Sequence, residues 1–187
     1  KESSFVYNGK VHQPEIEITS GLVDGDDVTV ETSVASAINV GNNYSVSASL
    51  TGEDSNNYKL PENNSLTYEI TPLEITTSVE NHTNVMYTRR KNNITFVSTL
   101  TGNGELNPEV KYEIRNSNEE IVATVQDKVV TVKNEEKFVV GTYNVYALVE
   151  SGNYLVTDYT SGILNIVNDS DYYKVVITFS TGKTSSE

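Results

Sequence analysis

Few residues in this chain have the types and spacing that a chemical function requires. The densest acidic segment is Asp24-Gly25-Asp26-Asp27, and calcium prefers several oxygen ligands from a flexible acidic loop. The spacing lacks the alternating ligands of an EF-hand loop, and Gly25 suits a turn with positive φ before a strand. We therefore expect a solvated turn here, with a calcium site at Asp24, Asp26 and Asp27 as the alternative.

Other reactive groups are sparse. The chain contains no Cys, which excludes disulfides, thiolate catalysis and Cys-based metal sites. Its two histidines, His12 and His82, are too few and too far apart in sequence to supply a zinc site. Ser180 and Lys183 have the S-x-x-K spacing of some acyl enzymes, but the accompanying motifs are missing. We expect no cofactor, no metal and no enzymatic activity, because domains this small leave little room for the cleft that a pair of catalytic acids needs.

Tyrosine is the abundant aromatic residue, with 12 copies and no Trp. Tyr44, Tyr68 and Tyr143 fall in phase with apolar neighbours, so we assign them to the core. Tyr146 and Tyr159 are less constrained, and an exposed ring can stack on a sugar or anchor a protein partner. These two residues are the candidates for ligand binding.

The charge balance limits the partners. With 13 basic and 26 acidic side chains, the chain has a formal charge of −13. This excess of acid argues against nucleic acid, whose phosphates require Lys and Arg, and against an anionic membrane surface. No apolar run reaches the roughly 18 residues of a spanning helix, so we expect no membrane insertion in this segment, and we expect a monomer. Lys1 is not preceded by Met, and we expect the chain to be a piece of a longer protein.

Strict alternation of apolar and small polar residues predicts β-strands. From Tyr44 to Thr51 every even position is apolar and every odd position is Ser or Thr. The same period-2 pattern, or a short β-branched run, marks the other expected strands, around Ile16–Ile18, Val28–Val30, Leu66–Ile70, 121–125, 129–132 and 143–149. No helical period is sustained over three turns. Short strands with Gly-containing turns between them predict an all-β chain, with a sandwich favoured over a barrel.

An internal repeat divides the chain. The segment beginning Gly41-Asn42-Asn43-Tyr44 recurs at Gly141-Thr142-Tyr143, and Asn57-Tyr58 recurs 96 residues later as Asn153-Tyr154. Repetition at this distance indicates two tandem copies of one domain. We expect domains at 1–72 and 73–167, a tail or truncated third module at 168–187, and a short, stiff joint at Pro72.

A set of short motifs follows in a family-like order. They are Tyr7-Asn8-Gly9, Gly25-Asp26-Asp27-Val28, Gly41-Asn42-Asn43-Tyr44-Ser45-Val46, Asn57-Tyr58 and Ile70-Thr71-Pro72. In this order they resemble the MBG/YDG type of bacterial repeat over residues 1–72. Residues 73–167 look like a diverged relative of the first domain or like another bacterial immunoglobulin-like type, and Tyr173–Gly182 resembles the first strand of an InlB-type B-repeat.

The resemblance implies two tandem immunoglobulin-like β-sandwich domains in an extracellular protein of a bacterial cell surface or wall, or a secreted one. It implies a non-enzymatic stalk or adhesion-related module whose partners are neighbouring immunoglobulin-like modules of the same chain. The alternative is a module that binds a host glycan or protein through a loop or through Tyr146 and Tyr159; an enzyme is the remaining alternative. The family has no catalytic residues to carry over.

Overall fold

The computed structural model describes residues 4–34, 37–87 and 93–167, and within them the chain is all-β. This confirms the predicted fold class. The strands are β1 Ser4–Val6, β2 Thr29–Val34, β3 Gly41–Thr51, β4 Ser65–Thr71, β5 Leu73–Val79, β6 His82–Met86, β7 Ser98–Thr101, β8 Lys111–Arg115, β9 Ile121–Gln126, β10 Val129–Val132, β11 Gly141–Leu148, β12 Tyr154–Thr160 and β13 Gly162–Val167. A single 3-10 turn, η1, spans Ser55–Asn57. The predicted tail at 168–187 lies outside the described residues.

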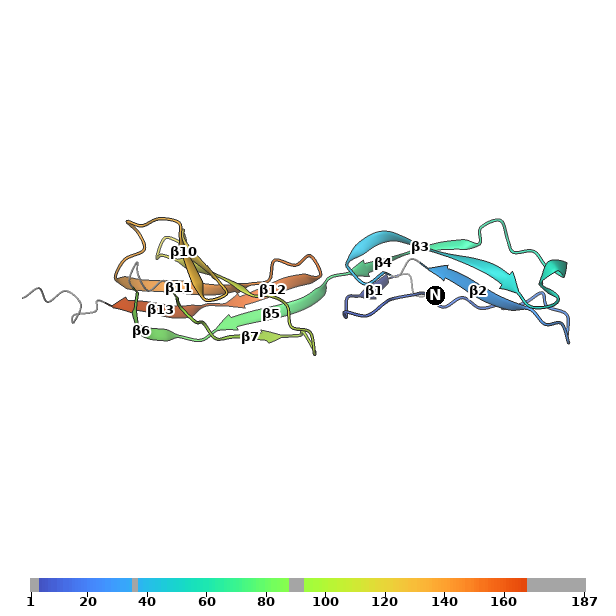
Figure 1. Ribbon diagram of the computed structural model, residues 1–187, viewed down its shortest axis with the longest axis horizontal. Helices are drawn as coiled ribbons and strands as arrows, with labels where there is room; N and C mark the ends of the chain where they lie inside the picture. The colour runs from blue at the N-terminus through green and yellow to red at the C-terminus, as the bar shows by residue number, and fades with distance from the viewer. Residues whose placement is uncertain (1–3, 35–36, 88–92, 168–187) are drawn as a thin grey trace, which may run out of the picture.

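Three sheets divide the strands at Pro72. A four-stranded first sheet, in the order β1-β4-β3-β2, uses residues 4–71, which we call the N-terminal half. A six-stranded large sheet, β10-β9-β8-β11-β13-β6, and a three-stranded small sheet, β12-β5-β7, use residues 73–167, the C-terminal half. The two halves lie end to end along an elongated molecule (Figure 1). The count of two tandem domains stays a prediction, while the sheet partners of each strand lie in its own half.

The first sheet follows the alternation seen in the sequence. On β3, Val46 is fully buried, while Tyr44, Ala48 and Leu50 on the same face are half-buried and the intervening serines are exposed. β3 pairs antiparallel with both β2 and β4. Strand β1 then adds in parallel to β4, with Phe5 opposite Ile70. The core of this half is small and consists of Ala37, Val46, Tyr68 and Ile70, with further side chains half-buried against it.

The strand predicted around Ile16 and Ile18 is wrong. Both side chains are half-buried, as the alternation indicates, but residues 13–19 form no ladder with any strand. Alternation reports which face of an extended segment is apolar; a ladder also needs a neighbouring strand to receive its backbone hydrogen bonds. In this structure no strand lies in the neighbouring position, among the residues that it describes.

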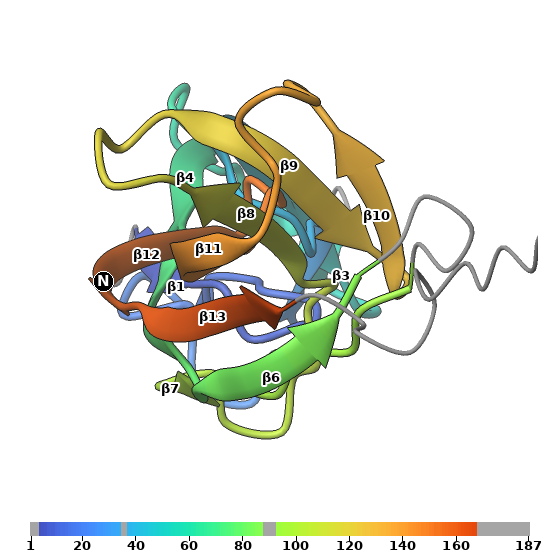
Figure 2. The ribbon, with the colours of Figure 1, turned by 90° about the vertical axis from the view of Figure 1, so that its left-hand side faces the viewer.

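The C-terminal half encloses a larger core. Its apolar residues come from both sheets and the loops between them, and they include Ile114, Val122, Val145 and Leu164, which are all but inaccessible to solvent. Figure 2 views this half along the long axis, with β9 and β10 at the top and β6 and β7 at the bottom. The predicted strands at 121–125, 129–132 and 143–149 correspond to β9, β10 and β11 and are confirmed.

Both halves share a tyrosine placed after a glycine at the start of a long strand. The Tyr44 hydroxyl donates to the Asn39 carbonyl at 3.0 Å. The Tyr143 hydroxyl lies 2.7 Å from the Val139 carbonyl and accepts from the Val139 N–H at 2.8 Å. A tyrosine that bonds back to the backbone a few residues upstream is a feature of immunoglobulin-like sandwiches, the tyrosine corner.

The last strand of each half is also built alike. In the N-terminal half, β4 pairs antiparallel with β3 and parallel with β1; in the C-terminal half, β13 pairs antiparallel with β11 and parallel with β6. Gly41 lies opposite Ile70, and Gly141 lies opposite Ile166. The sequence repeat therefore corresponds to a repeat of strand pairing.

Candidate functional site

The N-terminal half contains a groove on the inner face of its sheet. It consists of two adjoining hollows of about 870 Å³ and 310 Å³, which share Ile16, Glu17 and Val30 in their linings. We call the two together the N-terminal groove. The larger hollow is lined mainly by residues 13–17 and β2, and Gln13 donates to Thr32 across it at 2.6 Å.

The smaller hollow is enclosed by three parts of the chain. Strands β2 and β3 contribute Val30, Ala48 and Leu50, which are apolar and half-buried. Residues 16–22 contribute one further side and residues 58–61 the other, and neither segment belongs to a sheet. The hollow is therefore bordered by backbone without a ladder partner and carries an apolar surface between the two borders.

The predicted calcium turn lies beside this groove. Asp26 accepts a hydrogen bond from the Tyr58 hydroxyl at 2.6 Å, and that hydroxyl accepts from the Val23 N–H at 2.9 Å. The hydrogen bond to the Asp26 carboxylate is the main cause that raises the pKa of Tyr58. Asp24 is exposed at the tip of the turn. The carboxylate of Asp26 thus holds Tyr58, which lines the groove.

Asp27 has a different set of partners. Its N–H donates to Asp54 Oδ2 at 2.9 Å, and its backbone carbonyl accepts from the Asp54 N–H at 3.1 Å. Among the described residues the structure brings no three His, Cys, Asp or Glu side chains together in a metal-binding group. Asp26 and Asp27 therefore serve the local turn in this structure, and calcium binding stays a prediction.

Asn153 connects the two halves and was not predicted as a functional residue. Its side-chain oxygen accepts from the Val40 N–H at 2.9 Å, and its side-chain nitrogen donates to Asn39 Oδ1 at 3.0 Å. Its own carbonyl accepts from the Leu73 N–H at 3.0 Å, directly after Pro72. One residue thus fixes the end of the N-terminal half and the first strand of the C-terminal half.

A ring pair and a close contact complete this junction. Tyr7 and Tyr154 meet edge to face with ring centroids 5.4 Å apart, and burial is the main cause that raises the pKa of Tyr154. Gly9, at φ 74°, lies against Leu106, and a Cβ on Gly9 would approach the Leu106 side chain to 2.8 Å. The repeat marked Asn153-Tyr154 in the sequence, but only the structure shows that it contacts the other half.

Residues 2–65 match the family model of the YDG domain. The match covers about the first third of the chain. This confirms the resemblance for that segment; the likeness of Tyr173–Gly182 to an InlB-type B-repeat falls on residues outside the described part and stays a prediction. No curated protein matches the sequence.

Two solved structures are similar to the chain at low scores. The fibronectin(III)-like modules of CbhA from Clostridium thermocellum align over 96% of this chain and 95% of theirs, with 14% identity and a TM-score of 0.35. Domains EC1–3 of Drosophila N-cadherin align over 89% of this chain and 64% of theirs, with 9% identity and a TM-score of 0.29. The described part of the chain contains no helix of the length and hydrophobicity that a transmembrane span requires.

Of the two tyrosines predicted to bind a ligand, Tyr146 lies on β11, outside the segment that matches the YDG model, and its side chain already has partners. The Arg115 guanidinium lies over its ring at 4.7 Å from the centroid, and its hydroxyl lies 3.3 Å from Glu119 Oε2. Arg115 also bonds to Glu113 at 2.6 Å, the main cause that raises its pKa. No sequence pattern predicts this cluster, because β11 and β8 bring it together in space.

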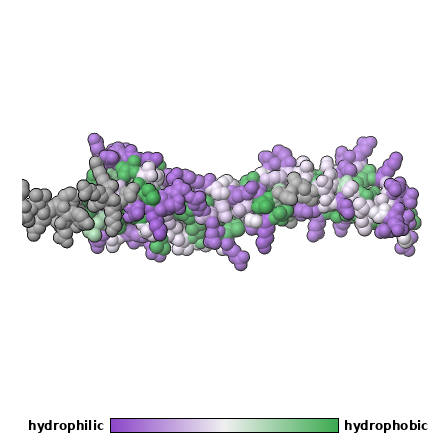
Figure 3. Space-filling view, in the orientation of Figure 1, coloured by the Kyte–Doolittle hydropathy of each residue, from purple (hydrophilic) through white to green (hydrophobic). Residues whose placement is uncertain are grey.

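Tyr159 lies on β12 and is 44% exposed. It belongs to the small sheet, whereas Tyr146 belongs to the large sheet, so the structure does not bring the two candidates into one patch. Figure 3 shows hydrophilic side chains over most of the visible face of both halves, with apolar ones scattered among them. Ligand binding by Tyr159 stays a prediction.

Proposed function

We propose that this chain is a non-enzymatic spacer module of a bacterial cell-surface or secreted protein, in which the YDG domain and the domain after it act as one stiff rod. The junction carries this proposal. Pro72 alone separates β4 from β5, and Asn153 bonds to the backbone on both sides of it. A proline joint with cross-contacts resists bending, unlike a Gly/Ser linker.

The surface charge supports a role in which neighbouring rods stay apart. Residues 1–72 carry 3 basic and 11 acidic side chains, and residues 73–167 carry 8 and 12. Both halves are therefore acidic, and like charge opposes close approach of two copies at low ionic strength. We place the protein outside the cell and propose that its main partners are adjoining modules of its own polypeptide.

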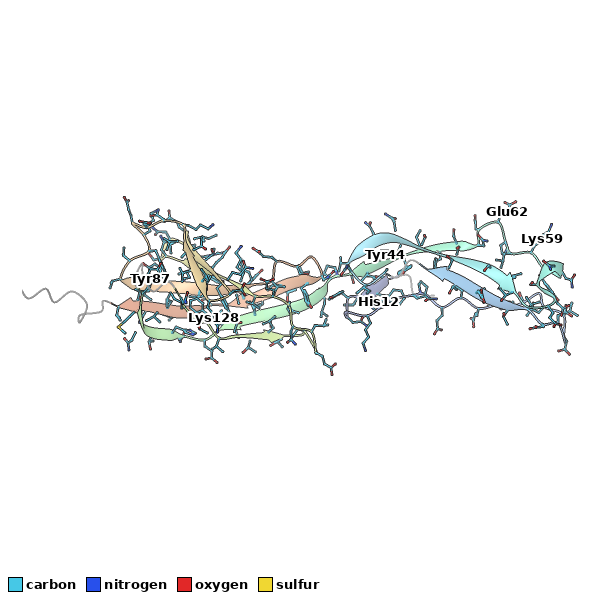
Figure 4. The ribbon with its side chains drawn as sticks, in the orientation of Figure 1. His12, Tyr44, Lys59, Glu62, Tyr87 and Lys128 are labelled. Carbon is cyan, nitrogen blue, oxygen red and sulfur yellow. The ribbon has the colours of Figure 1, made fainter. Side chains whose placement is uncertain are left out.

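A distance measurement between the two ends tests the rod. Because the chain has no Cys, Lys59→Cys and Lys128→Cys introduce two unique attachment points for spin labels. The two positions lie in opposite halves (Figure 4). We expect a single narrow distance distribution in the unmodified joint and a broad one after a Gly-Ser-Gly-Ser insertion at Pro72, since such linkers behave as flexible coils.

A wild-type distribution as broad as that of the insertion variant would contradict the proposal. Binding to a panel of host glycans and matrix proteins, measured with the unlabelled chain, separates a spacer from a receptor. Saturable binding that Tyr159→Ala abolishes would replace the spacer with a binding module.

A further inference from the structure

The small sheet of the C-terminal half has its first strand in the middle. β5 pairs in parallel with β12, with Leu73 to Ile75 opposite Tyr154 to Val156, and antiparallel with β7. Along β5 the inward residues Ile75, Thr77 and Val79 are buried. Strand β5 therefore fills the space between β12 and β7 and closes the core on that side.

The N-terminal half has the two outer segments of this arrangement. Residues 58–61 correspond to the start of β12, and the turn before them is the same: the Tyr58 N–H bonds to the Ser55 carbonyl at 3.2 Å, and the Tyr154 N–H to the Ser151 carbonyl at 3.1 Å. Residues 16–22 border the hollow on the side opposite residues 58–61, and we compare them with β7. They reach Gly21 at φ 94°, as β7 runs into Gly102 at φ 92°.

Of the residues that the structure describes, none forms a strand between these two segments, and the smaller hollow of the N-terminal groove lies there. The residue that lies beneath this position can also be compared between the two halves. In the C-terminal half Ala147 is 1% exposed, and its carbonyl accepts from the Thr77 hydroxyl of β5 at 2.9 Å. Its repeat counterpart, Ala48, lines the hollow and is only half-buried. The residue that β5 covers in one half is uncovered in the other.

We propose that the N-terminal groove is a strand slot that takes an extended, β5-like segment of polypeptide, parallel to residues 58–60 and antiparallel to residues 16–22. Its side chains would alternate, with apolar or Thr residues facing Val30, Ala48 and Leu50 and polar ones facing solvent. Pro61, which has no N–H, occupies the position of Thr157, where β12 has its register shift and makes no ladder pair with β5. The missing N–H of Pro61 therefore does not prevent residues 58–60 from pairing with an added strand.

The occupant that we assign is a segment of polypeptide joined ahead of Lys1. In the C-terminal half β5 passes through only Glu80 and Asn81 into β6, which pairs in parallel with the closing strand β13. Strand β1 makes the same parallel pairing with β4. By the same path, a segment joined ahead of Lys1 would enter the slot.

One difference shortens the slot. At Gly162 a Cβ would lie 2.5 Å from the Glu80 carbonyl oxygen, so glycine is required where β5 ends. The repeat counterpart of Gly162 is Leu66, whose side chain packs against the core of the N-terminal half. The side chain of Leu66 takes the space that Gly162 leaves free for the end of β5. We therefore expect the occupant to pair only over the length that corresponds to the first part of β5. This inference requires only the fold and does not depend on the spacer role.

Fusing a copy of residues 73–81 directly ahead of Lys1 of the full chain tests the slot. We expect the amide of Lys59 to exchange with solvent at least about tenfold more slowly, because it gains a partner on the added strand, as its counterpart Leu155 faces β5. A control fusion has the same composition with inward and outward residues interchanged, since a shift of one position moves every side chain to the opposite face. The control should leave this amide unprotected. Equal protection in both fusions, or in neither, would overturn the proposal.

A disulfide identifies the register and the source of the strand. We expect Leu60→Cys to cross-link within one chain to a Cys at the Ile75 position of the fused copy, because Val156, the counterpart of Leu60, lies opposite Ile75. Lys59→Cys, whose side chain points to the other face, should not. A cross-linked dimer, or slot protection in the unfused chain that rises with its concentration, would mean that a second copy supplies the strand, and would overturn the assignment to the polypeptide ahead of β1.

Discussion

The two halves of the molecule share a pattern of strand pairing but differ in the size of their hydrophobic cores. Each has a glycine and a tyrosine at the start of its long strand and a closing strand that pairs in parallel with an earlier one. Among the described residues, however, the core of the C-terminal half has fourteen buried members and that of the N-terminal half has four. Two features account for the difference. Strands β8, β9 and β10 supply Ile114, Val122 and Val130 to the larger core, and β5 closes that core where the other half has a groove.

This comparison teaches that a repeat of strand pairing does not imply equal stability. Apolar area removed from water is the main stabilising term, at about 25 cal/mol per Å². A half with a smaller core and an uncovered sheet face therefore gains less free energy from the burial of apolar surface. We expect the N-terminal half to unfold first, and the predictions below use paired positions to test that difference.

The largest effect is expected from Leu164→Ala. Leu164 is 0% exposed in the core of the C-terminal half, so the substitution leaves a cavity and costs about 2–5 kcal/mol. Urea unfolding followed by amide signals from each half should show only the C-terminal transition moving to lower denaturant. Ile163→Ala, at the neighbouring exposed position, serves as the control and should change stability by less than about 0.5 kcal/mol. A single transition that moves as a whole would show that the halves unfold together.

The second effect concerns the tyrosine corners. Tyr143→Phe removes a buried hydroxyl that contacts both the N–H and the carbonyl of Val139, so we expect a loss of about 1–3 kcal/mol. Tyr44→Phe removes one hydrogen bond at a more exposed position, and we expect about 0.5–1.5 kcal/mol. Thermal unfolding of the two variants compares the halves directly. Equal losses would contradict the view that the N-terminal corner is the looser one.

Much of this shared pattern is predictable from the sequence, because it depends on neighbours along one strand. The alternation from Tyr44 to Leu50 and the repeat at Tyr143 require only the period of a strand. The groove is different: it exists because no strand of the described part of the chain lies there, and no residue pattern predicts that absence. The wrongly predicted strand around Ile16 was the one sequence feature related to the groove. That segment has the alternation of a strand but no neighbouring strand to pair with. Contacts such as those of Asn153 and Arg115 depend on which elements meet in space, and spacing in sequence does not give that.

The third prediction compares two asparagines at the same position of the repeat. Asn153→Ala removes the side-chain bonds to Val40 and Asn39, each worth about 0.5–1.5 kcal/mol, and should broaden the distance distribution between labels at positions 59 and 128. Asn57→Ala changes the counterpart, which is exposed and lies in the other half, and should leave the distribution as narrow as in the parent. Broadening by both variants, or by neither, would show that Asn153 does not hold the junction.

The smallest effect is electrostatic and should have opposite signs in the two halves. The ion pairs between described side chains all lie in the C-terminal half, among them Lys137–Glu120 at 2.6 Å. The hydrogen bond from Lys137 is the main cause that lowers the pKa of Glu120. A carboxyl whose pKa is lower in the folded than in the unfolded state stabilises the fold at neutral pH. That contribution is lost as the pH falls from its ordinary value of about 4.3 through the lowered one.

Glu120→Gln should therefore lower the midpoint of the C-terminal transition slightly at pH 7 and low salt, and its difference from the parent should shrink as the pH falls through the lowered pKa of Glu120. Added salt should weaken this exposed pair. In the N-terminal half, where the sequence has 11 acidic and 3 basic side chains up to residue 72, salt screens repulsion instead and should raise the midpoint. Titrating one sample with NaCl while following amide signals from both halves measures the two responses together. Midpoints that move in the same direction would show that net repulsion, rather than particular pairs, governs both halves.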